Sequence, residues 1–508
     1  MKLVLLCAED FSLSVACLSA FLKKNGHEVM VVFDPKQFGK AYADNKYLSR
    51  LFSRRALILR RIKEFSPDLV GFSVFTSNYQ WALSVAEEIK KGMDVPIIFG
   101  GIHATLVPEV VIKEPSVDMV CVGEGERPLL ELLQGIKDKN RDYSIKNVWF
   151  KDGERVIVNE IRPLTEDLDT LPFPDRESLY AQLPRSYSKY PIMLTSYGCP
   201  YRCTYCANNA ISRVYKDKGS YLRRRSPASV IAELREIKSR YMPKYILFMD
   251  DLFTFNKSWL ADFAMSYSRD IRLPYSCLTH ARFLDKEICN LLKLSHCNLV
   301  LLGLQSGCER IRREVLDRPE SNEEYRKAAG FLKEARLKFS LDNILNIPFD
   351  TPDTIRESFY FYNELRPDMI HSFNLAYFPN TKIIEHGIRA GVLKEDSRDL
   401  INRGLSGNYI NIQLDSHGDY RRYALLFTIL PLLPGRFAAK IIKDSILKRI
   451  LLGLPSAVIL LVKFILNVRA GTGFIFFNVI NNELFYLKAL LSGKIKARIS
   501  RNEVLCSQ

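Results

Sequence analysis

Three cysteines within eight residues, Cys199, Cys203 and Cys206, form a C-x3-C-x2-C stretch directly after the apolar run 191–194. Thiolates this close together can hold one soft metal centre. A four-iron cluster with three protein thiolates keeps one iron free of protein ligands, and a substrate or cofactor can bind there. The alternative is a zinc knuckle, but structural zinc takes four ligands, usually in two separated pairs. No second C-x2-C and no H-x3-H follows, so the spacing predicts a 4Fe-4S cluster with an open iron.

The stretch 198–206, with the aromatic Tyr205 before the third cysteine, resembles the signature of the radical S-adenosylmethionine (SAM) enzymes. The resemblance implies that the open iron chelates the amino and carboxylate groups of SAM. Reductive cleavage of SAM then releases a 5′-deoxyadenosyl radical, which removes a hydrogen atom from an unactivated carbon. On this reading the cluster ligands, and the residues that carry the catalysis, are Cys199, Cys203 and Cys206.

The length and the cysteine usage indicate a globular protein of a reducing compartment. A chain of 508 residues is long enough for about three domains. Outside the triplet the cysteines are scattered, mostly in apolar runs, so buried free thiols are expected rather than disulfides. The segment 1–6 reads as a first strand and not as a signal peptide. We therefore expect a cytoplasmic protein. Peripheral contact with the inner face of the membrane stays open as an alternative.

Strand and helix patterns alternate through residues 1–137, which predicts a doubly wound parallel sheet of the flavodoxin-like kind. The expected helices cover 13–24 and 79–91, and the expected strands cover 2–7, 28–33, 69–74, 95–99 and 117–122. Ligands of such sheets lie outside the carboxyl ends of the strands. The candidate binding residues in those loops are Ser73, Thr76, Ser77, Gly100, Gly101, His103, Gly123, Glu124 and Gly125.

These loops are also compatible with a plain flavodoxin-like module. Placed before a radical SAM signature, they resemble the cobalamin-binding domain of the cobalamin-dependent radical SAM group. The known motif D-x-H-x-x-G is absent, because Ser12 stands two residues after Asp10. The resemblance thus implies cobalamin bound without a histidine of that motif on cobalt, its nucleotide tail held by the Ser/Thr and glycine loops. His103 is either a neighbour of the corrin or a loop hydrogen-bonder.

The tRNA methylthiotransferases are a second family that places a module before a radical SAM domain. Their first domain carries its own three-cysteine cluster. Here Cys7 and Cys121 end apolar strands and Cys17 lies in a helix, so all three read as core thiols. This family is therefore disfavoured.

Residues 138–187 read as a connector and residues 188–395 as a partial (β/α)6 barrel. The connector contains an expected hairpin, 148–150 against 156–158, with Asp152-Gly153 at its turn. Six strands are expected in the barrel, at 192–196, 244–249, 274–278, 298–303, 339–345 and 369–376. The cluster loop follows the first of them, at the end where barrel enzymes keep their chemistry.

Other strand ends of this barrel resemble the SAM contacts of the family. Asp250 and Asp251 stand where a polar motif meets the methionine amino group, with a helix cap before 252–256 as the alternative. Gln305 and Ser306 stand in a G-I-E-S-G-like segment and imply a ribose contact through an amide. Asn346 is the implied adenine contact in a G-x-P-G-E-T-like loop. Both glycines of that loop are replaced, and Phe349 does not suit left-handed backbone, so a different loop shape is expected.

Residues 396–508 read as a mainly helical, basic and apolar region. Of the formal charge of +16, residues 420–508 supply fourteen Lys/Arg against three Asp/Glu. The rest of the chain is only mildly basic, so no nucleic-acid partner is expected. The apolar stretches 423–433, 450–462 and 474–480 are too short or too interrupted to span a bilayer. The region is either a cap on the barrel or a surface contact with anionic lipid.

The resemblance implies three cofactors, a 4Fe-4S cluster, SAM and cobalamin, and the partners are a small-molecule or lipid-like substrate and a reductant such as flavodoxin or ferredoxin. The implied reaction is methylation of an unactivated carbon, using the 5′-deoxyadenosyl radical and methylcobalamin. Radical rearrangement, cyclisation or oxidation without methyl transfer stays open. So does a non-catalytic cobalamin or cluster sensor, and a tRNA substrate is disfavoured because no RNA-binding module is evident.

Overall fold

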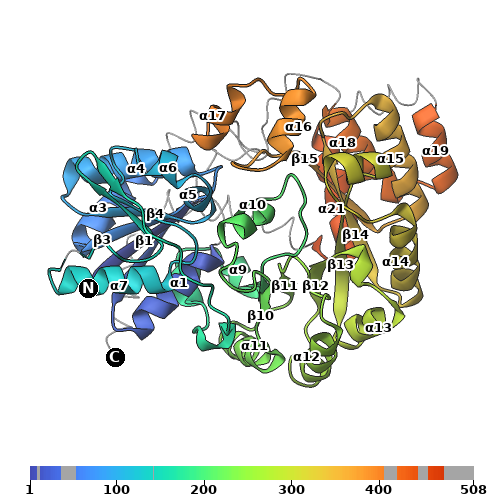
Figure 1. The fold of residues 1–508 in the computed structure, drawn as a ribbon. Helices are drawn as coiled ribbons and strands as arrows, with labels where there is room; N and C mark the ends of the chain where they lie inside the picture. Colours follow the sequence, from blue (N-terminus) through green and yellow to red (C-terminus); the bar gives the residue numbers. More distant parts are fainter. Residues whose placement is uncertain (9–11, 36–52, 141, 406–419, 444–455, 474–508) are drawn as a thin grey trace.

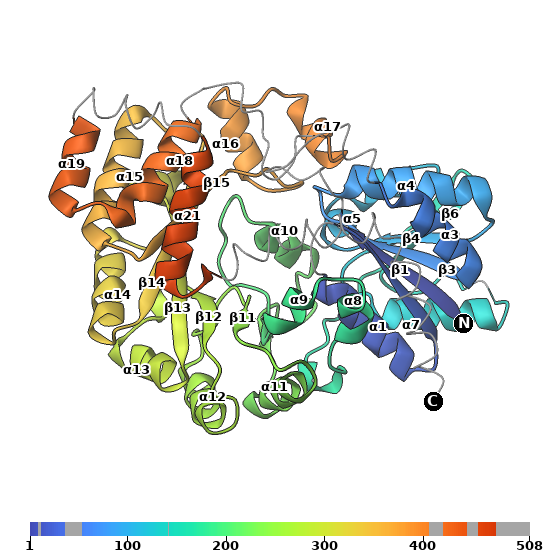
Figure 2. The same ribbon diagram turned by 180° about the vertical axis from the view of Figure 1, so that it is seen from behind.

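The computed structural model describes residues 1–8, 12–35, 53–140, 142–405, 420–443 and 456–473. Two α/β domains lie side by side, the first at the left of Figure 1 and the second at its right. Figure 2 shows the same pair from behind, with the helices at 420–443 and 456–470 against the second domain. The fold is therefore the predicted one: a parallel-sheet domain, a partial barrel and a mainly helical end.

The first sheet has seven strands in the order β2-β1-β3-β4-β5-β6-β7. The first five are parallel, and β6 and β7 run antiparallel at the edge. The strands are β1 (Lys2–Ala8), β2 (Glu28–Asp34), β3 (Leu69–Ser73), β4 (Ile97–Gly100), β5 (Met119–Cys121), β6 (Val148–Asp152) and β7 (Arg155–Ile157). The hairpin expected in the connector thus extends this sheet, and its turn is Gly153-Glu154, one residue later than expected.

Both faces of this sheet are buried, which explains the continuous apolar runs of its strands. Leu3 and Leu5 of β1 pack in one core and Val4 and Leu6 in the other, because successive side chains of a strand alternate. The first core includes α1 (Leu13–Lys24) and α7 (Glu126–Lys137), and the second includes α3 (Arg55–Phe65) and α4 (Tyr79–Gly92). Two short helices, α5 (Ile102–Leu106) and α6 (Pro108–Val111), follow β4.

The second sheet has six parallel strands in the order β15-β14-β13-β12-β11-β8. They are β8 (Ile192–Met193), β11 (Ile246–Phe248), β12 (Tyr275–Thr279), β13 (Cys297–Gln305), β14 (Lys338–Leu345) and β15 (Met369–Asn374). Each is one of the six predicted strands. A two-stranded ribbon, β9 (Ser196–Tyr197) and β10 (Arg223–Arg224), follows β8 and leads into the cysteine loop.

Helices cover the outer face of this open sheet, as in a partial barrel. They are α11 (Pro227–Tyr241), α12 (Lys257–Asp270), α13 (Lys286–Leu294), α14 (Asn322–Glu334) and α15 (Pro352–Leu365), whereas α10 (Ala207–Val214) lies at the side of the sheet that faces the first domain. Ser226 caps α11 by accepting a hydrogen bond from Ser229 N, and Pro227 is the first residue of the helix. The connector adds α8 (Arg176–Tyr180) and α9 (Arg185–Lys189).

Three helices of the C-terminal region, α18 (Tyr420–Ile429), α19 (Gly435–Lys443) and α21 (Ser456–Ala470), pack on the second domain. Before them along the chain come α16 (Ile383–Arg389) and α17 (Ser397–Asn402). Leu426 and Phe427 of α18 and Leu466 of α21 belong to the core of the second domain. No helix in the described ranges is long and apolar enough to cross a membrane. Of the predicted apolar stretches, 450–455 and 474–480 lie outside the described residues.

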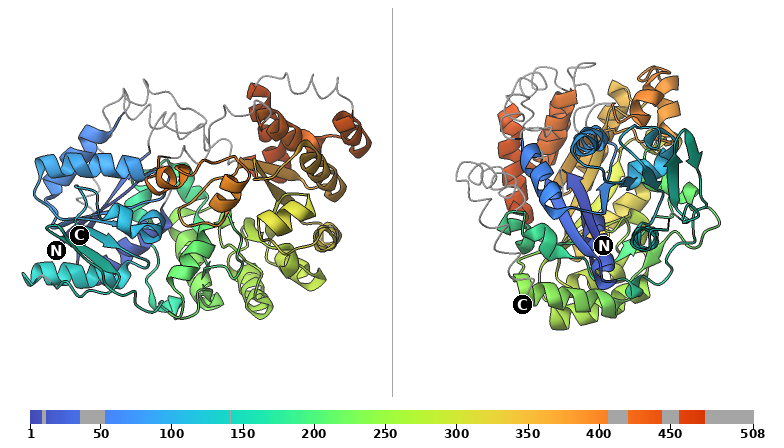
Figure 3. Two further views of the ribbon diagram at one scale, coloured as in Figure 1. Left: turned by 45° about the horizontal axis from the view of Figure 1, so that its top comes forward. Right: turned by 90° about the vertical axis from the view of Figure 1, so that its left-hand side faces the viewer.

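The two domains contact each other along several segments. Helix α10 of the second domain lies against α5 of the first. After β15 the chain turns back over the first domain, as the position of α16 and α17 in Figure 3 makes clear. Asn380 Nδ2 donates to Leu106 O at 2.5 Å, and Gln80 Nε2 donates to Arg403 O at 2.6 Å. These contacts bring the carboxyl ends of both sets of strands to one interface.

Candidate active site

The three clustered cysteines lie at that interface, on the loop between β9 and α10. Gly198 opens the loop with φ at +86°, a conformation that favours glycine. A Cβ atom at Gly198 would lie 2.2 Å from Tyr221 O, so no other residue fits without moving the backbone. Cys206 ends the loop as the N-cap residue of α10. Glycine is thus required before the first cysteine for two reasons, the positive φ and the close approach of Tyr221 O.

The environment of the three thiols suits a soft metal centre. Burial raises the pKa of Cys199 to about 12 and that of Cys206 to about 11, so both are protonated near neutrality until a metal displaces the proton. No group of three His, Cys, Asp or Glu side chains in the described ranges is gathered tightly enough for a single ion. A four-iron cluster instead places each thiolate on its own iron, and the three thiols of one loop fit that donor set.

A buried cation stands beside the cysteine loop. Arg318 Nη1 lies 3.9 Å from Cys203 Sγ and donates to Tyr205 Oη at 3.2 Å. Its Nη2 donates to the buried Glu320 Oε1 at 2.8 Å. His280 contacts the same carboxylate through Nε2, and its ring stacks on Tyr201, with centroids 4.1 Å apart. The pair Arg318–Glu320 therefore fixes a positive group at the mouth of the barrel.

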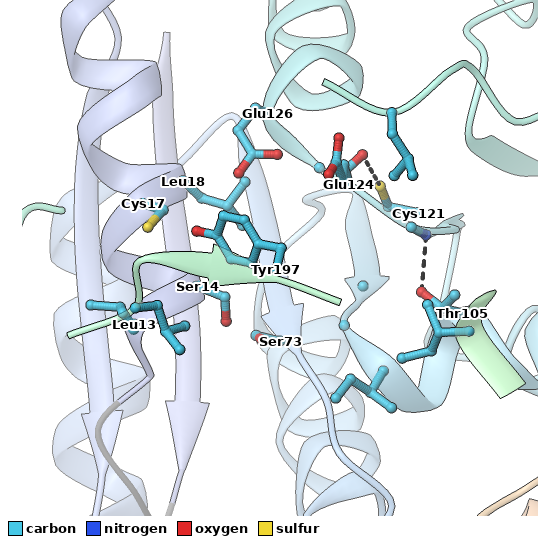
Figure 4. Close-up of a pocket in the computed structure, with 18 of the residues that line it drawn as sticks. Leu13, Ser14, Cys17, Leu18, Ser73, Thr105, Cys121, Glu124, Glu126 and Tyr197 are labelled. Atoms are coloured by element: carbon cyan, nitrogen blue, oxygen red, sulfur yellow. Dashed lines mark hydrogen bonds between the residues drawn. The ribbon is translucent and has the colours of Figure 1, made fainter. Parts of the chain in front are cut away.

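A cavity of about 440 Å3 lies between the strand tips of the first domain and the entry to the cysteine loop. Figure 4 shows side chains from both domains around it, among them Ser73 of β3 and Tyr197 of β9. Its deep part is apolar and lies between the sheet and helices α1 and α7, lined by Leu5, Leu13, Leu18, Gly71, Ile98 and Leu129. Gly71 keeps this part open, because a Cβ atom there would lie 3.0 Å from Leu5 Cδ2.

Several predicted loop residues line this cavity, namely Ser73, Gly100, Gly101, Gly123, Glu124 and Gly125. Gly101 has φ at +91°, and a Cβ atom there would lie 2.9 Å from Val74 N. Gly123 has φ at +88°. The glycines thus form a backbone cradle that a flat ligand can approach closely. These features fit a cobalamin whose tail enters the apolar cleft.

The other predicted residues of the first domain lie elsewhere. His103 is fully buried, its Nδ1 lies 3.1 Å from Thr76 Oγ1, and its ring lies 4.3 Å from that of Tyr79. Burial lowers the pKa of His103 to about 4, so the imidazole is neutral. His103 and Ser77 line neither of the interface cavities. The alternative reading of His103 as a loop hydrogen-bonder therefore agrees with the geometry. Asp10 lies outside the described residues.

A second cavity of about 380 Å3 adjoins the first, because Phe75, Ile102, Asn208 and Ile211 line both. It reaches Cys206 and Tyr205 on one side, and Gln305, Asp342 and Ile344 of the barrel on the other. Thr76 of the first domain also lines it. Apolar side chains of the segment 373–378 close its far wall. No Lys or Arg is among the described residues that line it.

The two acids at the end of β11 have different environments. Asp250 is fully buried and accepts hydrogen bonds from Thr195 N at 2.9 Å and Thr195 Oγ1 at 2.7 Å. Asp251 lines the first cavity, accepts from Asn208 Nδ2 at 2.9 Å, and has its pKa raised to about 6 by burial of its carboxyl group. The segment 251–254 is a turn and α12 begins at Lys257, capped by Asn256. The helix-cap alternative is therefore wrong, and of the pair only Asp251 faces a cavity.

Of the remaining SAM candidates, only Gln305 lines a cavity, with φ at +68°. Ser306 is buried and accepts from Cys308 N at 3.3 Å, away from both cavities. Asn346 donates through Nδ2 to Asn374 Oδ1 at 2.6 Å. Asn346 and Phe349 have φ at +61° and +67°. The expectation that Phe349 avoids left-handed backbone is therefore wrong, while the expected change of loop shape stays a prediction.

Sequence reasoning missed several residues that the fold brings to the two cavities. They are Cys17, Glu126, Tyr197, Asn208, Tyr215, Tyr221, Arg223 and Asp342. Most sit on helices or on the β9–β10 ribbon, where nothing in the local pattern separates a pocket residue from a core one. Of these residues, Asp342 could have been found from the sequence, because a carboxylate inside an apolar strand needs a partner or a ligand. In the structure His371 Nδ1 lies 3.2 Å from Asp342 Oδ1.

Two family models match the chain. The B12 binding domain model matches residues 9–133, and the radical SAM superfamily model matches residues 193–361. The first match covers the strand-tip glycines of the first cavity, and the second covers the cysteine loop and the strands β8 to β14. The two matches therefore meet at the interface where both cavities lie.

Curated relatives resemble about two thirds of the chain. An uncharacterized methyltransferase of Pyrococcus horikoshii is 26% identical over 344 residues, covering 66% of this chain and 72% of the relative. The anaerobic magnesium-protoporphyrin IX monomethyl ester cyclase of Rubrivivax gelatinosus is 23% identical, covering 70% of this chain and 62% of the cyclase. The chain therefore spans under two thirds of the cyclase.

Solved structures of low identity share the fold. The radical SAM methyltransferase TsrM of Kitasatospora setae, solved with cobalamin and a 4Fe-4S cluster, superposes with a TM-score of 0.61 at 18% identity, covering 75% of this chain and 73% of TsrM. The cobalamin-dependent radical enzyme OxsB with aqua-cobalamin gives a TM-score of 0.65 at 14% identity, covering 99% and 81%. The two-domain arrangement is thus a known one.

Proposed function

The chain belongs to the cobalamin-dependent radical SAM enzymes, and from this premise we propose that it methylates an unactivated carbon of a small-molecule or lipid-like substrate. One observation carries the proposal. The glycine cradle of the first domain and the cysteine loop of the second open into adjoining cavities, which share four lining residues. A substrate carbon held there would be within reach of both the radical formed beside the cysteine loop and the methyl group carried by the cobalamin.

The cysteine loop and its neighbours fit a cluster with SAM. When bound, this pair supplies the 5′-deoxyadenosyl radical. Cys199, Cys203 and Cys206 would hold the cluster. The carboxylate of Asp251, which lines the first cavity, would accept hydrogen bonds from an ammonium group. Gln305 and Asp342 line one wall beside Cys206 and can hydrogen-bond two ribose hydroxyls.

The first cavity fits cobalamin, which supplies the methyl group when bound. Gly71, Leu5 and the facing leucines of α1 and α7 would bury an aromatic base of the nucleotide tail. The cradle of Gly100, Gly101 and Gly123 lets backbone approach the corrin edge, and Ser73 offers a hydroxyl donor. We do not propose His103 as a cobalt ligand, because its ring is buried against Tyr79 and contacts Thr76 through Nδ1.

The second cavity indicates an apolar, uncharged substrate group. Phe75, Ile344 and Phe378 line it, and no described lining residue is cationic. Anionic groups such as phosphate would find no counter-charge there. Water is displaced from such a wall easily, which protects a carbon radical from side reactions.

We propose a reductant of the flavodoxin or ferredoxin kind as the electron source.

Isotope transfer tests the proposal directly. Anaerobically reconstituted protein should bind iron and hydroxocobalamin, and should release 5′-deoxyadenosine from SAM under reduction. With trideuteromethyl-SAM and a metabolite extract, a product gaining three deuterium atoms supports methylation. A product of altered mass that carries no label rules it out. The variants Cys199→Ala, Cys203→Ala and Cys206→Ala should lose both iron and 5′-deoxyadenosine formation; continued formation would overturn the cluster assignment.

Ring closure without methyl transfer is the second candidate, favoured by the likeness to the cyclase of Rubrivivax gelatinosus. Both candidates use the same cofactor sites, so the label decides between them. A cofactor sensor is a third class of function, and steady turnover of SAM by the wild-type protein would exclude it.

A further inference from the structure

Glu124 lies in the cradle loop of the first domain, yet both of its carboxylate oxygens are engaged by other segments of the chain. Oε1 lies 2.7 Å from Arg223 Nη1 in an ion pair. Oε2 accepts from the backbone N–H of Thr165 at 3.0 Å. The backbone N–H of Glu124 donates to Tyr215 Oη at 2.6 Å. One residue of the first domain thus meets the connector, the ribbon strand β10 and the end of α10.

The neighbouring glycine makes room for this arrangement. A Cβ atom at Gly123 would lie 1.9 Å from Tyr215 Oη. The backbone N–H of Gly123 donates to Thr105 Oγ1 at 2.9 Å, which anchors the loop inside its own domain. The phenol of Tyr215 therefore rests directly on the cradle loop, in a space that only glycine leaves free.

Arg223 continues the connection to the cysteine loop. Its side chain is largely buried, and Nη1 also donates to Thr165 O at 2.6 Å. In the β9–β10 ribbon, Arg223 pairs with Tyr197. Tyr197 is followed directly by Gly198 and Cys199. The cradle of the first domain is therefore joined to the first cysteine of the second in three steps. These are the ion pair of Glu124 with Arg223, the strand pairing of Arg223 with Tyr197, and the chain from Tyr197 to Cys199.

We infer that Glu124 is a positioning residue, which together with Arg223 and Tyr215 forms an interdomain joint that sets the distance from the corrin cradle to the cysteine loop. The inference rests on the proposed function for what the two sites hold, but the joint itself consists of contacts of this chain. It reassigns Glu124, which the loop pattern alone places among the cofactor ligands. Partly buried, hydrogen-bonded ion pairs hold geometry better than exposed ones.

The test compares Glu124→Ala and Arg223→Ala with a matched control. Glu131→Ala removes an ion pair of similar geometry, Glu131 with Arg162 Nη2 at 2.8 Å, which joins α7 to the connector but not to the second domain. Hydrogen exchange in the cofactor-free protein is the first measurement. Exchange over residues 196–206 should rise about tenfold in both joint variants and stay unchanged in the control, since freed segments open more often.

The loaded enzyme gives the second measurement. Pulsed electron paramagnetic resonance reports the separation of cob(II)alamin and the reduced cluster, both of which are paramagnetic. The joint variants should keep full iron and cobalamin content, but with a broader distance distribution and about tenfold less product, because small misplacements of reacting groups are costly. The exchanged pair Glu124→Arg with Arg223→Glu should restore a narrow distribution.

Each outcome has a single meaning. Lower cobalamin affinity in Glu124→Ala, with Arg223→Ala unaffected, would make Glu124 a cofactor contact and overturn the joint. Unchanged exchange and unchanged distance in both variants would also overturn it. Failure of the wild-type protein to bind cobalamin or iron would instead overturn the proposed function, and the exchange experiment would still decide the joint.

Discussion

Glu320 links the charge of Arg318 to the stability of the site. Burial opposes its ionisation, but the contact with His280 and the charge of Arg318 outweigh it and lower the pKa of Glu320 to about 2. Because the pKa in the folded protein lies below its ordinary value of 4.5, the ionised form stabilises the fold at neutral pH. That contribution is present above about pH 4.5 and is lost as the pH falls toward 2.

The variant Glu320→Gln should therefore lower the free energy of unfolding by about 3 kcal/mol at pH 7, since each pKa unit corresponds to about 1.4 kcal/mol. The difference from wild type should shrink as the pH falls below about 4.5. Urea denaturation at several pH values measures both. A difference that does not change with pH would mean that packing, and not charge, explains the loss.

Gly198 gives a prediction about the cysteine loop itself. The variant Gly198→Ala would force a left-handed residue into contact with Tyr221 O, so the loop should shift and iron binding should fall severely. Iron content after reconstitution is the measurement. The control is Gly330→Ala in α14, where a Cβ atom meets nothing within 4 Å. That variant should bind iron normally and gain about 0.5–1 kcal/mol of stability. Normal iron content in Gly198→Ala would show that the loop tolerates a side chain.

At the scale of elements, the tips of neighbouring barrel strands share left-handed backbone. Gln305 at the end of β13, Asn346 after β14 and Asn380 beyond β15 all have positive φ. Sparsely populated conformations of this kind collect at binding sites, where the surrounding structure holds them. Phe349 is the least suited residue, with φ at +67° and a side chain that is 42% exposed.

Replacing Phe349 with glycine should therefore relieve backbone strain. The variant Phe349→Gly is expected to raise the free energy of unfolding by about 0.5–1 kcal/mol, because the left-handed cost of about 1–2 kcal/mol exceeds the extra entropy of an unfolded glycine. Asn346→Gly should instead lose about 1 kcal/mol with its hydrogen bond to Asn374. Chemical denaturation compares the two. A less stable Phe349→Gly would mean that the contact of Phe349 with His386 outweighs the strain.

The sequence predicted elements and their order better than contacts between them. All six barrel strands and the five parallel strands of the first domain follow from apolar runs and helix spacing, which are local. The register that pairs β6 with β5 and the ion pair of Glu124 with Arg223 depend on segments far apart in the chain. The same limit explains why Ser306 resembles a site residue but is buried against Ser358. Local patterns identify strand tips without fixing which side chains face the cavity.

At the scale of the whole molecule, the described C-terminal helices complete the core of the second domain. Phe427 of α18 is 1% exposed, and its ring lies 5.7 Å from Phe359 and 5.3 Å from Tyr362, both on α15. Leu466 of α21 is equally buried. These contacts agree with the cap reading of the region, because a face that served only lipid contact would not be buried against the barrel helices.

Truncating the Phe427 side chain distinguishes a cap on the barrel from a membrane contact. Phe427→Ala should lower the free energy of unfolding by about 3–5 kcal/mol, the usual cost of an aromatic cavity in a core. It should leave binding to vesicles of anionic lipid unchanged. Phe437→Ala, on α19 with 43% of the side chain exposed, is the matched control and should cost little stability. If instead Phe427→Ala kept its stability and lost vesicle binding, the barrel would not need α18, and the region would serve the lipid surface.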